Sequence, residues 1–335
     1  MQKVQAYGAH EQGAALTPFN YELPDLGSDQ VDIKVESCGI CHSDLSVLDN
    51  EWGISSYPAV AGHEVIGIVT ARGSNATTVE VGQRVGLGWF SKSCMHCRYC
   101  MGGDHNLCQT VEATILGRFG GFADVVRCNV EWAIPLPAEL DAASAGPLFC
   151  AGITVFNAIV QSGIRPTQRV GVIGIGGLGH LALQFLTKWG CEVTAFTSSV
   201  EKGNEAKHFG AHYVVNSRDS AAMEGLVGKY DFILNTTNAN LDWAAYINAL
   251  APKGRLHTVG AVPDPIPVPV FPILLGQKSV GASPLGSPAT IQDMLSFCAR
   301  HKIAPTIEPF PMAEINKAIE RLRSGKARYR VVLTR

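Results

Sequence analysis

The sequence has no apolar run of the ~18 to 20 residues that a transmembrane helix needs, so a membrane-spanning protein is not expected. It also has no block of consecutive Lys and Arg residues, and its formal net charge is only -2. A nucleic-acid partner, which requires a basic surface, is therefore not expected either. The first residues, MQKVQAYGAH, contain no apolar core of a signal peptide, and the default prediction is a cytoplasmic protein.

Charged residues are scarce at 17%, whereas apolar residues make up 46% of the 335 residues. This composition is typical of a globular protein, and a chain of this length usually forms about two domains. Up to residue 147, segments such as QVDIKVESCGI and AGHEVIGIVTARG alternate apolar and polar residues, which predicts antiparallel strands. From residue 148 on, short apolar strands alternate with helical patterns, which predicts an α/β fold with a doubly wound parallel sheet.

The stretch GVIGIGGLGHLALQF carries Gly174, Gly176 and Gly179 in the spacing G-x-G-x-x-G, between a predicted strand and a predicted helix. In this context the glycines allow a tight turn, and the backbone can approach a pyrophosphate at the N-terminus of the helix. We therefore predict a dinucleotide-binding loop that also includes Gly177 and Leu178. The alternative is a glycine-rich turn that binds nothing.

The end of the next predicted strand, CEVTAFTSS, indicates which dinucleotide is bound. An NAD site usually has a carboxylate there to hold the ribose 2′-hydroxyl, and this strand has none before Glu201. Ser198, Ser199 and Lys202 instead offer two hydroxyls and a positive charge, which suits the 2′-phosphate of NADP(H). The alternative is that the two serines only cap the following helix.

Ten cysteines occur in the chain, and four of them lie in one short segment: Cys94, Cys97, Cys100 and Cys108. Tetrahedral zinc needs four ligands that a short turn can bring together, so this spacing predicts a zinc site. Four thiolates leave no open coordination position, which indicates a structural role. An iron–sulfur cluster is the main alternative, whereas a redox site usually has a single C-x-x-C pair.

A second zinc site is predicted from residues that lie far apart in the sequence. A catalytic zinc keeps three protein ligands and one open position, and two cysteines with one histidine form a known set. Cys41 is the first residue of CHSDL, and His63 lies in AGHE. These two residues are candidates for two of the three ligands. Cys150, in GPLFCAGITVF, is the best candidate for the third ligand, because it stands where the β-rich part meets the α/β part.

Several of these motifs together resemble one known family. GICHSDL, AGHEVIG, AGPLFCAGIT, GIGGLGHLA and GKARYRVVL are similar to motifs of the zinc-dependent medium-chain alcohol dehydrogenases. Within that family the chain looks like the cinnamyl-alcohol-dehydrogenase-like branch, close to bacterial broad-range NADPH-dependent aldehyde reductases. The resemblance covers essentially the whole chain. It implies a GroES-like catalytic zinc-binding domain over residues 1–147 and 286–335, and a Rossmann NADP-binding domain over residues 148–285.

The resemblance also implies roles for residues around the catalytic zinc. Glu64 matches a carboxylate that approaches the metal during ligand exchange, and Asp44 matches an acid that orients the ligand histidine. Ser43 matches the hydroxyl that passes a proton between the substrate oxygen and solvent. His42 matches a contact to the cofactor pyrophosphate, and Thr154 matches one near the nicotinamide. The alternative for Ser43 and Asp44 is that they cap a helix.

Two zinc ions per chain follow from this resemblance, because Cys41, His63 and Cys150 match the catalytic ligands and the four-cysteine segment matches the structural site. Two differences from relatives stand out. Many relatives have a histidine where this chain has Ser46, so the outer proton path is expected to run through the cofactor ribose and water. The loop at residues 109–123 is shorter than in plant cinnamyl alcohol dehydrogenases, which argues against an enzyme specific for monolignols.

The expected activity is the reversible reduction of a broad range of aldehydes to primary alcohols by hydride transfer from NADPH, with zinc polarising the carbonyl oxygen. The resemblance also implies a homodimer, joined through the cofactor domain near residues 266–272. An NAD-dependent polyol or secondary-alcohol dehydrogenase is the main alternative. A zinc-free quinone reductase would lack both sets of zinc ligands, and a non-catalytic zinc-binding interaction protein would leave the glycine-rich loop without a role.

Overall fold

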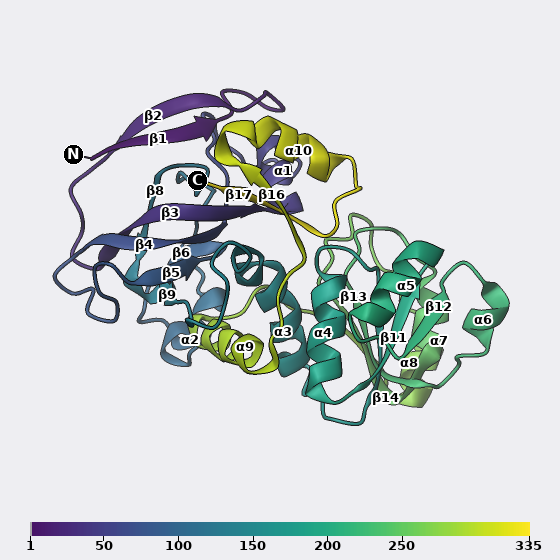
Figure 1. The fold of residues 1–335 in the computed structure, drawn as a ribbon. Helices are drawn as coiled ribbons and strands as arrows, with labels where there is room; N and C mark the ends of the chain where they lie inside the picture. Colours follow the sequence, from purple (N-terminus) through teal and green to yellow (C-terminus); the bar gives the residue numbers. More distant parts are fainter. Residues whose placement is uncertain (1) are drawn as a thin grey trace. The chain divides into compact units, whose positions relative to one another are not determined.

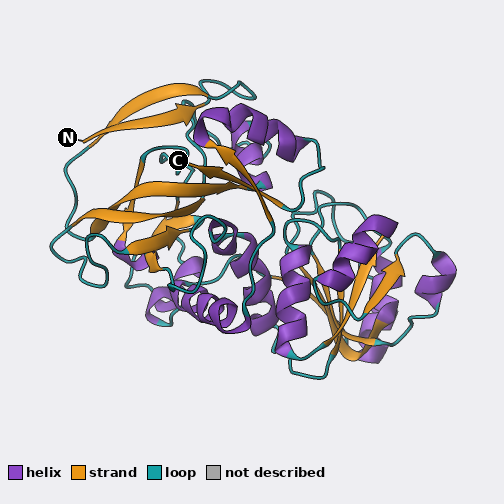
Figure 2. Ribbon diagram, viewed as in Figure 1, coloured by secondary structure: helices purple, strands orange, loops and turns teal. Residues whose placement is uncertain are grey.

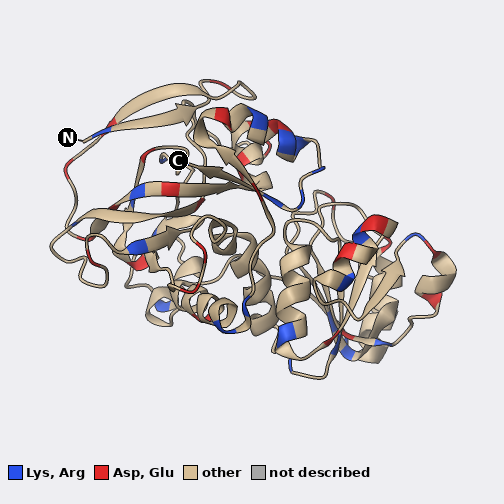
Figure 3. Ribbon diagram, viewed as in Figure 1, with Lys and Arg blue, Asp and Glu red and all other residues tan. Residues whose placement is uncertain are grey.

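The computed structural model describes residues 2–335, which form two compact units. Unit 1 contains the chain up to Ile153 together with Gly286–Arg335, and unit 2 contains Thr154–Leu285. Each unit has its own sheet and helices, which Figure 1 labels along the chain and Figure 2 colours by type. Basic and acidic residues are interspersed along both units, as Figure 3 shows.

Unit 1 is built around the long strand β3 (Gln30–Ile40), whose apolar residues Val31, Ile33 and Val35 are buried. This strand pairs antiparallel with β4, β8 and β17, and the strand order of the sheet is β16-β17-β3-β4-β5-β9. Antiparallel strands are what the alternating sequence pattern predicts for this part of the chain. The other strands of the sheet are β4 (Glu64–Arg72), β5 (Arg84–Leu87), β8 (Val125–Asn129), β9 (Ile134–Pro135), β16 (Ile307–Pro311) and β17 (Arg330–Thr334).

Two smaller antiparallel pairs and several helices complete unit 1. Helix α9 begins where Ser287 accepts a hydrogen bond from the Thr290 N–H at 3.4 Å and Pro288 occupies the first turn, a common combination at helix N-termini. The smaller pairs are β1 (Gln2–Gly8) with β2 (Thr17–Leu23), and β6 (Phe90–Lys92) with β7 (Glu112–Ala113). The helices are α1 (His42–Leu48), α2 (Arg98–Met101), α9 (Pro288–His301) and α10 (Ile315–Arg323).

Unit 2 contains a six-stranded sheet in which all neighbouring strands are parallel, in the order β12-β11-β10-β13-β14-β15. Strand β10 lies between β11 and β13, so the direction of winding reverses there. The carboxyl ends of the strands at such a reversal form the crevice in which doubly wound folds bind ligands. The strands are β10 (Arg169–Ile173), β11 (Glu192–Thr197), β12 (Tyr213–Asn216), β13 (Tyr230–Asn235), β14 (Leu250–Thr258) and β15 (Ser279–Ala282).

Helices alternate with these strands and cover both faces of the sheet (Figure 2). Strand β10 is buried after Arg169, as expected for a parallel strand with helices on both sides. This arrangement confirms the predicted doubly wound α/β part. The helices are α4 (Gly179–Trp189), α5 (Val200–His208), α6 (Ser220–Glu224), α7 (Trp243–Ala249) and α8 (Val270–Gly276), and α3 (Ala151–Gln161) begins in unit 1 and continues into unit 2.

The alternating prolines of residues 263–272 predict an extended segment, but only part of it is extended. The chain is irregular up to Pro269, and helix α8 begins at Val270. Pro272 lies in the first turn of this helix, where a missing N–H costs no helical hydrogen bond, so the helix tolerates it. Over residues 2–335, no helix combines the length and the apolar character that a membrane crossing requires.

Candidate active site

Cys41, His63 and Cys150 come from three segments of unit 1 and meet in its interior. Cys41 directly follows β3 and His63 directly precedes β4, and these strands pair so that both residues lie at the same end of the sheet. Cys150 ends the 3-10 turn η3 (Gly146–Phe149). His63 Nε2 lies 3.3 Å from Cys150 Sγ, which lies 3.8 Å from Cys41 Sγ. All three residues are buried, so the three donor atoms converge on one enclosed point.

Asp44 holds this cluster together from the first turn of α1. Its Oδ1 accepts hydrogen bonds from His63 Nδ1 and from the Gly62 N–H, both at 2.8 Å. Its Oδ2 accepts one from the Cys41 N–H, also at 2.8 Å. Because Nδ1 of His63 donates to the carboxylate, its Nε2 is the nitrogen that could bind a metal. Asp44 therefore both caps α1, as the alternative interpretation predicts, and orients the histidine.

Glu64, the first residue of β4, is fully buried and forms an ion pair with Arg330 of β17. Strand β17 pairs with β3 so that Val331 lies opposite Ile40, which brings Arg330 to this end of the sheet. Burial raises the pKa of Glu64, and Arg330 only partly opposes this. The second oxygen of Glu64, Oε2, is buried and accepts no hydrogen bond from any described residue. This oxygen is thus available as a further ligand.

Contacts among the three converging donors shift their pKa values. A hydrogen bond from the Cys150 thiol lowers the pKa of Cys41 well below its usual value, although burial opposes this. The same contact raises the pKa of Cys150. Burial lowers the pKa of His63, but the Asp44 carboxylate and Cys41 together outweigh burial and raise the pKa well above its usual value. Metal binding requires deprotonated cysteines and a neutral histidine, so a cation would release protons from this cluster.

The distances in the cluster fit a tetrahedral zinc site. A Zn–S bond of ~2.3 Å and a Zn–N bond of ~2.0 to 2.1 Å place neighbouring ligand atoms roughly 3.5 to 3.8 Å apart. The corresponding distances here are 3.3 and 3.8 Å. With Glu64 included, all four ligand atoms lie within 4.8 Å of one another. The donor set therefore offers two thiolates, one imidazole and one carboxylate oxygen to a single ion.

Residues predicted to act around this cluster lie near it in the chain. Ser43, in the first turn of α1, is half-buried, and its Oγ lies 3.9 Å from Cys41 Sγ. His42 begins α1 and is exposed, and Thr154 lies in α3 one turn after Cys150. Ser46, which stands where many relatives have histidine, is buried and donates to Glu51 Oε2 at 2.6 Å.

Two tryptophans form an apolar wall beside the cluster. The Trp89 ring packs edge-on against the His63 ring, with 4.9 Å between the ring centroids. Trp52 packs edge-on against Trp89 at 5.9 Å and is 41% exposed. The wall therefore runs from His63 to the protein surface, where it can contact the apolar part of an organic molecule.

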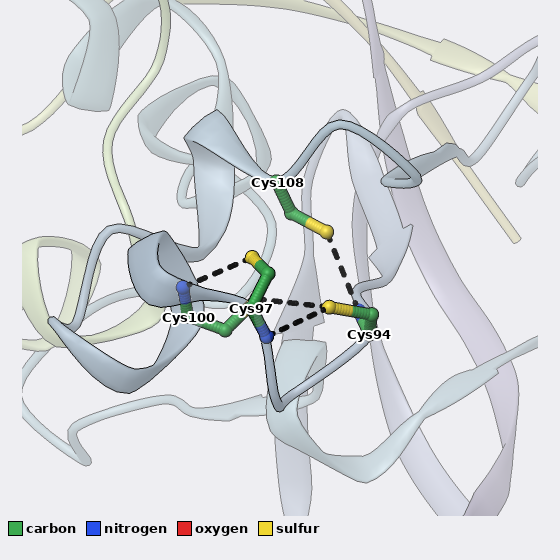
Figure 4. A group of neighbouring side chains, drawn as sticks. All are labelled: Cys94, Cys97, Cys100 and Cys108. Atoms are coloured by element: carbon green, nitrogen blue, oxygen red, sulfur yellow. Dashed lines mark hydrogen bonds between the residues drawn. The ribbon is translucent and has the colours of Figure 1, made fainter.

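The four cysteines of the second predicted zinc site form a separate cluster in unit 1 (Figure 4). Their sulfur atoms all lie within 4.8 Å of one another, and Cys94 Sγ is 3.9 Å from Cys100 Sγ. Backbone N–H groups donate to three of the sulfurs, for example from Cys97 to Cys94 Sγ at 3.3 Å. Such bonds stabilise thiolates, and they lower the pKa of Cys108 to about 6 against the effect of burial. This donor set fits a closed tetrahedral zinc site.

The glycine-rich loop connects β10 to α4 in unit 2. Gly174 has a φ of +84°, which strongly favours glycine, and a side chain there would collide with Thr237. Gly176 has a different reason to be glycine, because a Cβ built on it would meet no protein atom within 4 Å. Its missing side chain leaves open space over the loop, as the close approach of a pyrophosphate requires. Gly177 and Leu178 complete the loop, and Gly179 is the first residue of α4.

His180, the second residue of α4, holds this loop from within the protein. The residue is fully buried, and its backbone N–H donates to the Gly176 carbonyl at 3.1 Å. Its Nδ1 lies 3.0 Å from the same oxygen, and because a carbonyl only accepts, Nδ1 carries the proton. In a trans peptide the carbonyl and the following N–H point in opposite directions. The Gly177 N–H is therefore directed away from His180.

The residues predicted to select the dinucleotide follow β11. Ser199 Oγ accepts a hydrogen bond from the Lys202 N–H at 3.2 Å and caps α5, which is the alternative role considered for it. Ser198 is exposed and lines two hollows of about 750 and 290 Å³. Lys202 is half-buried. Helix capping thus accounts for Ser199 but not for Ser198.

Comparisons with known proteins agree with this picture. The profile of the alcohol dehydrogenase GroES-like domain matches residues 27–138, and that of zinc-binding dehydrogenases matches residues 177–300. The chain is 54% identical to the aldehyde reductase AdhA of Synechocystis sp., over 99% of this chain and 98% of that protein. The chain belongs to the zinc-dependent medium-chain alcohol dehydrogenases.

Solved structures place this alcohol dehydrogenase in the cinnamyl-alcohol-dehydrogenase-like branch. A cinnamyl alcohol dehydrogenase of Sorghum bicolor matches with a TM-score of 0.95 at 36% identity, over 99% of this chain and 98% of that one. The Helicobacter pylori enzyme of that type, complexed with NADP(H), matches with a TM-score of 0.90 at 28% identity, over 99% and 98% of the two chains. The predicted family and the combination of GroES-like and Rossmann folds are confirmed.

Two residues, one beside the cysteine–histidine cluster of unit 1 and one beside the glycine loop of unit 2, were not predicted from the sequence. Arg330 lies in the motif GKARYRVVL, but nothing in that motif indicates a partner 266 positions earlier in the chain. His180 directly follows the glycine motif, and its position in GLGH was the available signal. A polar residue at a position where a helix packs into the core is such a signal, because a buried polar group needs a partner.

Proposed function

We propose that the protein is a zinc-dependent aldehyde reductase that converts a broad range of aldehydes reversibly to primary alcohols with NADPH. The observation that carries this proposal is the convergence of Cys41, His63 and Cys150 on one point, in a chain whose second unit has a dinucleotide-type glycine loop. The relative named aldehyde reductase AdhA, at 54% identity, supports an aldehyde as the substrate.

We assign metal binding to the first part of the fold and cofactor binding to the second. The proposed catalytic domain comprises residues 1–147 and 286–335, and the proposed NADP-binding domain comprises residues 148–285. The positions of the two cysteine clusters in unit 1 and of the glycine loop in unit 2 support this assignment. Cys150 lies where the two domains meet in sequence.

The residues of unit 1 supply binding and proton transfer. Zinc held by Cys41, His63 and Cys150 would polarise the aldehyde oxygen, while bound NADPH would supply the hydride. Asp44 keeps the proton on His63 Nδ1, so that Nε2 stays a ligand. Ser43 Oγ, beside Cys41, would pass a proton to the product oxygen while taking one from solvent, and would return it to solvent in the reverse direction.

Glu64 and Arg330 act on the charge of the same site. Two thiolates and one carboxylate would otherwise place three negative charges around one divalent ion, and the Arg330 guanidinium offsets one of them. We propose that Glu64 Oε2, which has no hydrogen-bond partner in the described chain, replaces an outgoing ligand during exchange. Trp89 and Trp52 exclude water from one side of the cluster.

We propose a second, structural zinc at Cys94, Cys97, Cys100 and Cys108, which makes two zinc ions per chain. The chain around these residues contains one short helix, α2, and little buried apolar surface, so the metal would replace a core as the stabilising element. These two clusters are the only groups of three or more converging ligand residues in residues 2–335.

We propose NADP(H) as the cofactor. No carboxylate stands at the end of β11, where an NAD site would hold the ribose, and Ser198 is exposed there. The related Helicobacter pylori enzyme complexed with NADP(H) supports the same choice. His42, Thr154, Ser199 and Lys202 remain proposed contacts to this cofactor, together with the loop residues Gly174, Gly176, Gly177, Leu178 and Gly179.

We further propose that two copies of the chain form a homodimer. Residues around α8 present an exposed apolar surface: Val268, Val270, Phe271, Leu274 and Leu275. Strand β15, at the end of the six-stranded sheet, has β14 on one side only, so a second copy could continue the sheet there. None of the ten cysteines forms a disulfide, which supports the cytoplasm as the proposed compartment.

The metal sites provide the main test of this function. Purified protein should contain about two zinc ions per chain, and Cys41→Ala should contain about one. Cys41→Ala should abolish aldehyde reduction and leave NADPH affinity within about twofold, because only a ligand in unit 1 is lost. Cys94→Ser should also lose one zinc, but its first effect should be a lower Tm. Retained activity in Cys41→Ala would contradict the catalytic role.

A second measurement addresses the cofactor and the substrate. We expect NADPH to support faster reduction than NADH at equal concentration, and short aliphatic, long aliphatic and aromatic aldehydes all to react. The alternative, an NAD-dependent polyol or secondary-alcohol dehydrogenase, predicts a preference for NADH and rapid oxidation of a polyol with NAD⁺. If the protein bound zinc but turned over none of the aldehydes or alcohols tested, this would favour the non-catalytic interaction protein.

A further inference from the structure

The hollows beside Ser198 show which side chains surround the expected position of the adenosine ribose. Ser198 lines both hollows, and the larger one, about 750 Å³, has the size of an ordinary ligand pocket. Its walls come from the turn after β12, from α6, and from residues 239–248 around the start of α7. These walls lie beyond the carboxyl ends of parallel strands, where doubly wound folds bind nucleotides.

Arg218 lies in this wall, directly beside the end of β11. Strands β11 and β12 are parallel, with Thr197 opposite Asn216, so both chains leave the sheet at the same edge. The Ser217 N–H donates to the Thr197 carbonyl at 3.3 Å, which continues the pairing for one residue beyond the strands. The Arg218 N–H then donates to Asn216 Oδ1 at 3.1 Å and fixes the turn. Ser198 and Arg218 are thereby held as neighbours across the sheet edge.

The charges of the two hollows single out Arg218. Among the described residues that line the hollows, the cations are Arg218 and Lys207, and Lys202 is not one of them. Arg218 is exposed, and its guanidinium forms no ion pair within residues 2–335. The acids of the larger hollow are Glu224, at the far end of α6, and Asp242, whose Oδ1 accepts a hydrogen bond from the Ala245 N–H. Arg218, which the pairing of β11 with β12 brings to the end of β11, is thus an unpaired cation.

We propose that Arg218 is a specificity-determining residue of this enzyme, whose guanidinium binds the 2′-phosphate of NADP(H) together with the Ser198 hydroxyl. This inference rests on the proposed use of NADP(H). A guanidinium can donate two parallel hydrogen bonds to one phosphate, and such charge-assisted pairs are stronger than hydroxyl contacts alone. Because a 2′-hydroxyl offers no charge to the guanidinium, Arg218 favours NADP(H) over NAD(H).

The test uses binding as well as turnover. Isothermal titration calorimetry would compare adenosine 2′,5′-bisphosphate with adenosine 5′-monophosphate, which differ only in the 2′-phosphate. For Arg218→Ala we expect the bisphosphate to bind about 10- to 100-fold more weakly, the loss typical of a hydrogen bond to a charged group, and the monophosphate to bind within about twofold of wild type. The ratio of kcat/KM for NADPH over NADH should fall by the same factor.

Arg165→Ala is the matched control. Arg165 is also an exposed arginine of unit 2, but it precedes β10 and therefore lies at the amino ends of the strands. The Arg165→Ala substitution removes the same charge from the opposite ends of the strands and should leave the binding of both nucleotides unchanged.

Three outcomes would overturn the inference. If wild type prefers the bisphosphate and Arg218→Ala does not change this, NADP(H) remains the cofactor and Arg218 is not its determinant. If Arg218→Ala weakens both nucleotides equally, the residue serves the adenosine and not the 2′-phosphate. If wild type binds both equally and prefers NADH, the proposed NADP(H) preference itself is wrong.

Discussion

Asp44 makes the hydrogen bonds that hold Cys41 and His63 in place in the cluster with Cys150. One of its oxygens serves both the His63 ring and the Gly62 N–H, and the other serves the N–H of Cys41. Only a carboxylate has two acceptor oxygens, since the amide of asparagine has one acceptor and one donor group. A single side chain therefore sets the tautomer of His63 and the backbone position of Cys41.

His180 gives a prediction at the same scale. His180→Leu removes the Nδ1 donor and leaves only the backbone N–H on the Gly176 carbonyl, so the loop should be held less firmly and the KM for NADPH should rise roughly tenfold, the effect of about one hydrogen bond. The kcat at saturating NADPH should change little. His180→Asn restores a donor near the Nδ1 position and should keep a KM close to that of wild type. Steady-state kinetics of both variants, with Tm as a check on folding, would decide; equal KM values in the two variants would contradict the role.

Among the elements, β14 is tied to its surroundings by a buried histidine. His257 Nε2 lies 2.9 Å from Ser283 Oγ, and its Nδ1 lies 3.4 Å from Ser162 Oγ, at the end of α3. Burial, with a smaller effect of Arg255, lowers the pKa of His257 to about 4. In the unfolded chain the same group titrates near the ordinary value of 6.5. The folded state therefore excludes a proton that the unfolded state binds.

The sign of the resulting pH dependence follows from these two pKa values. The contribution of neutral His257 to the free energy of unfolding is fully present above pH 6.5. It is lost as the pH falls to about 4, and the total loss is on the order of 2 kcal/mol. His257→Gln cannot titrate, so its free energy of unfolding should depend less on pH over this window. Urea unfolding at several pH values would measure the difference. His208→Gln, at an exposed position on α5, should show the wild-type slope, and an identical slope for His257→Gln would refute the argument.

Elements whose functional residues lie close together in sequence could be predicted, and those assembled from distant segments could not. The four cysteines and the glycine loop each form within one short segment, so their spacing reveals them. The choice of Cys150 as the third ligand came from its place between the two sequence patterns. Arg330 and Arg218 depend on which strands pair and in which register, and that register is decided by packing across the whole sheet.

At the scale of the whole molecule, unit 2 has an exposed apolar surface on α8. Phe271 is 77% exposed and Leu275 80% exposed, both on α8. An exposed apolar patch next to an edge strand commonly marks an interface, because burial of that surface stabilises association. The proposed homodimer would bury it.

A charge on this surface tests the dimer. Phe271→Asp should convert a dimer into a monomer, because a carboxylate would have to be buried without a partner in the interface. Size-exclusion chromatography with light scattering gives the mass directly. Tyr213→Asp is the control: Tyr213 is 54% exposed on β12, the strand at the opposite edge of the same sheet, and its replacement should leave the dimer intact. A monomeric wild-type protein would rule out the proposal.

Arg330 reaches its partner Glu64 across 266 positions of the chain. A ribosome that has just produced Glu64 must therefore translate most of the protein before the balancing cation exists. Until β17 has left the exit tunnel and joined β3, the nascent polypeptide holds an acid, two thiols and an imidazole with no arginine beside them. The proposed catalytic zinc would therefore meet its complete set of surrounding charges only late in the biogenesis of each molecule.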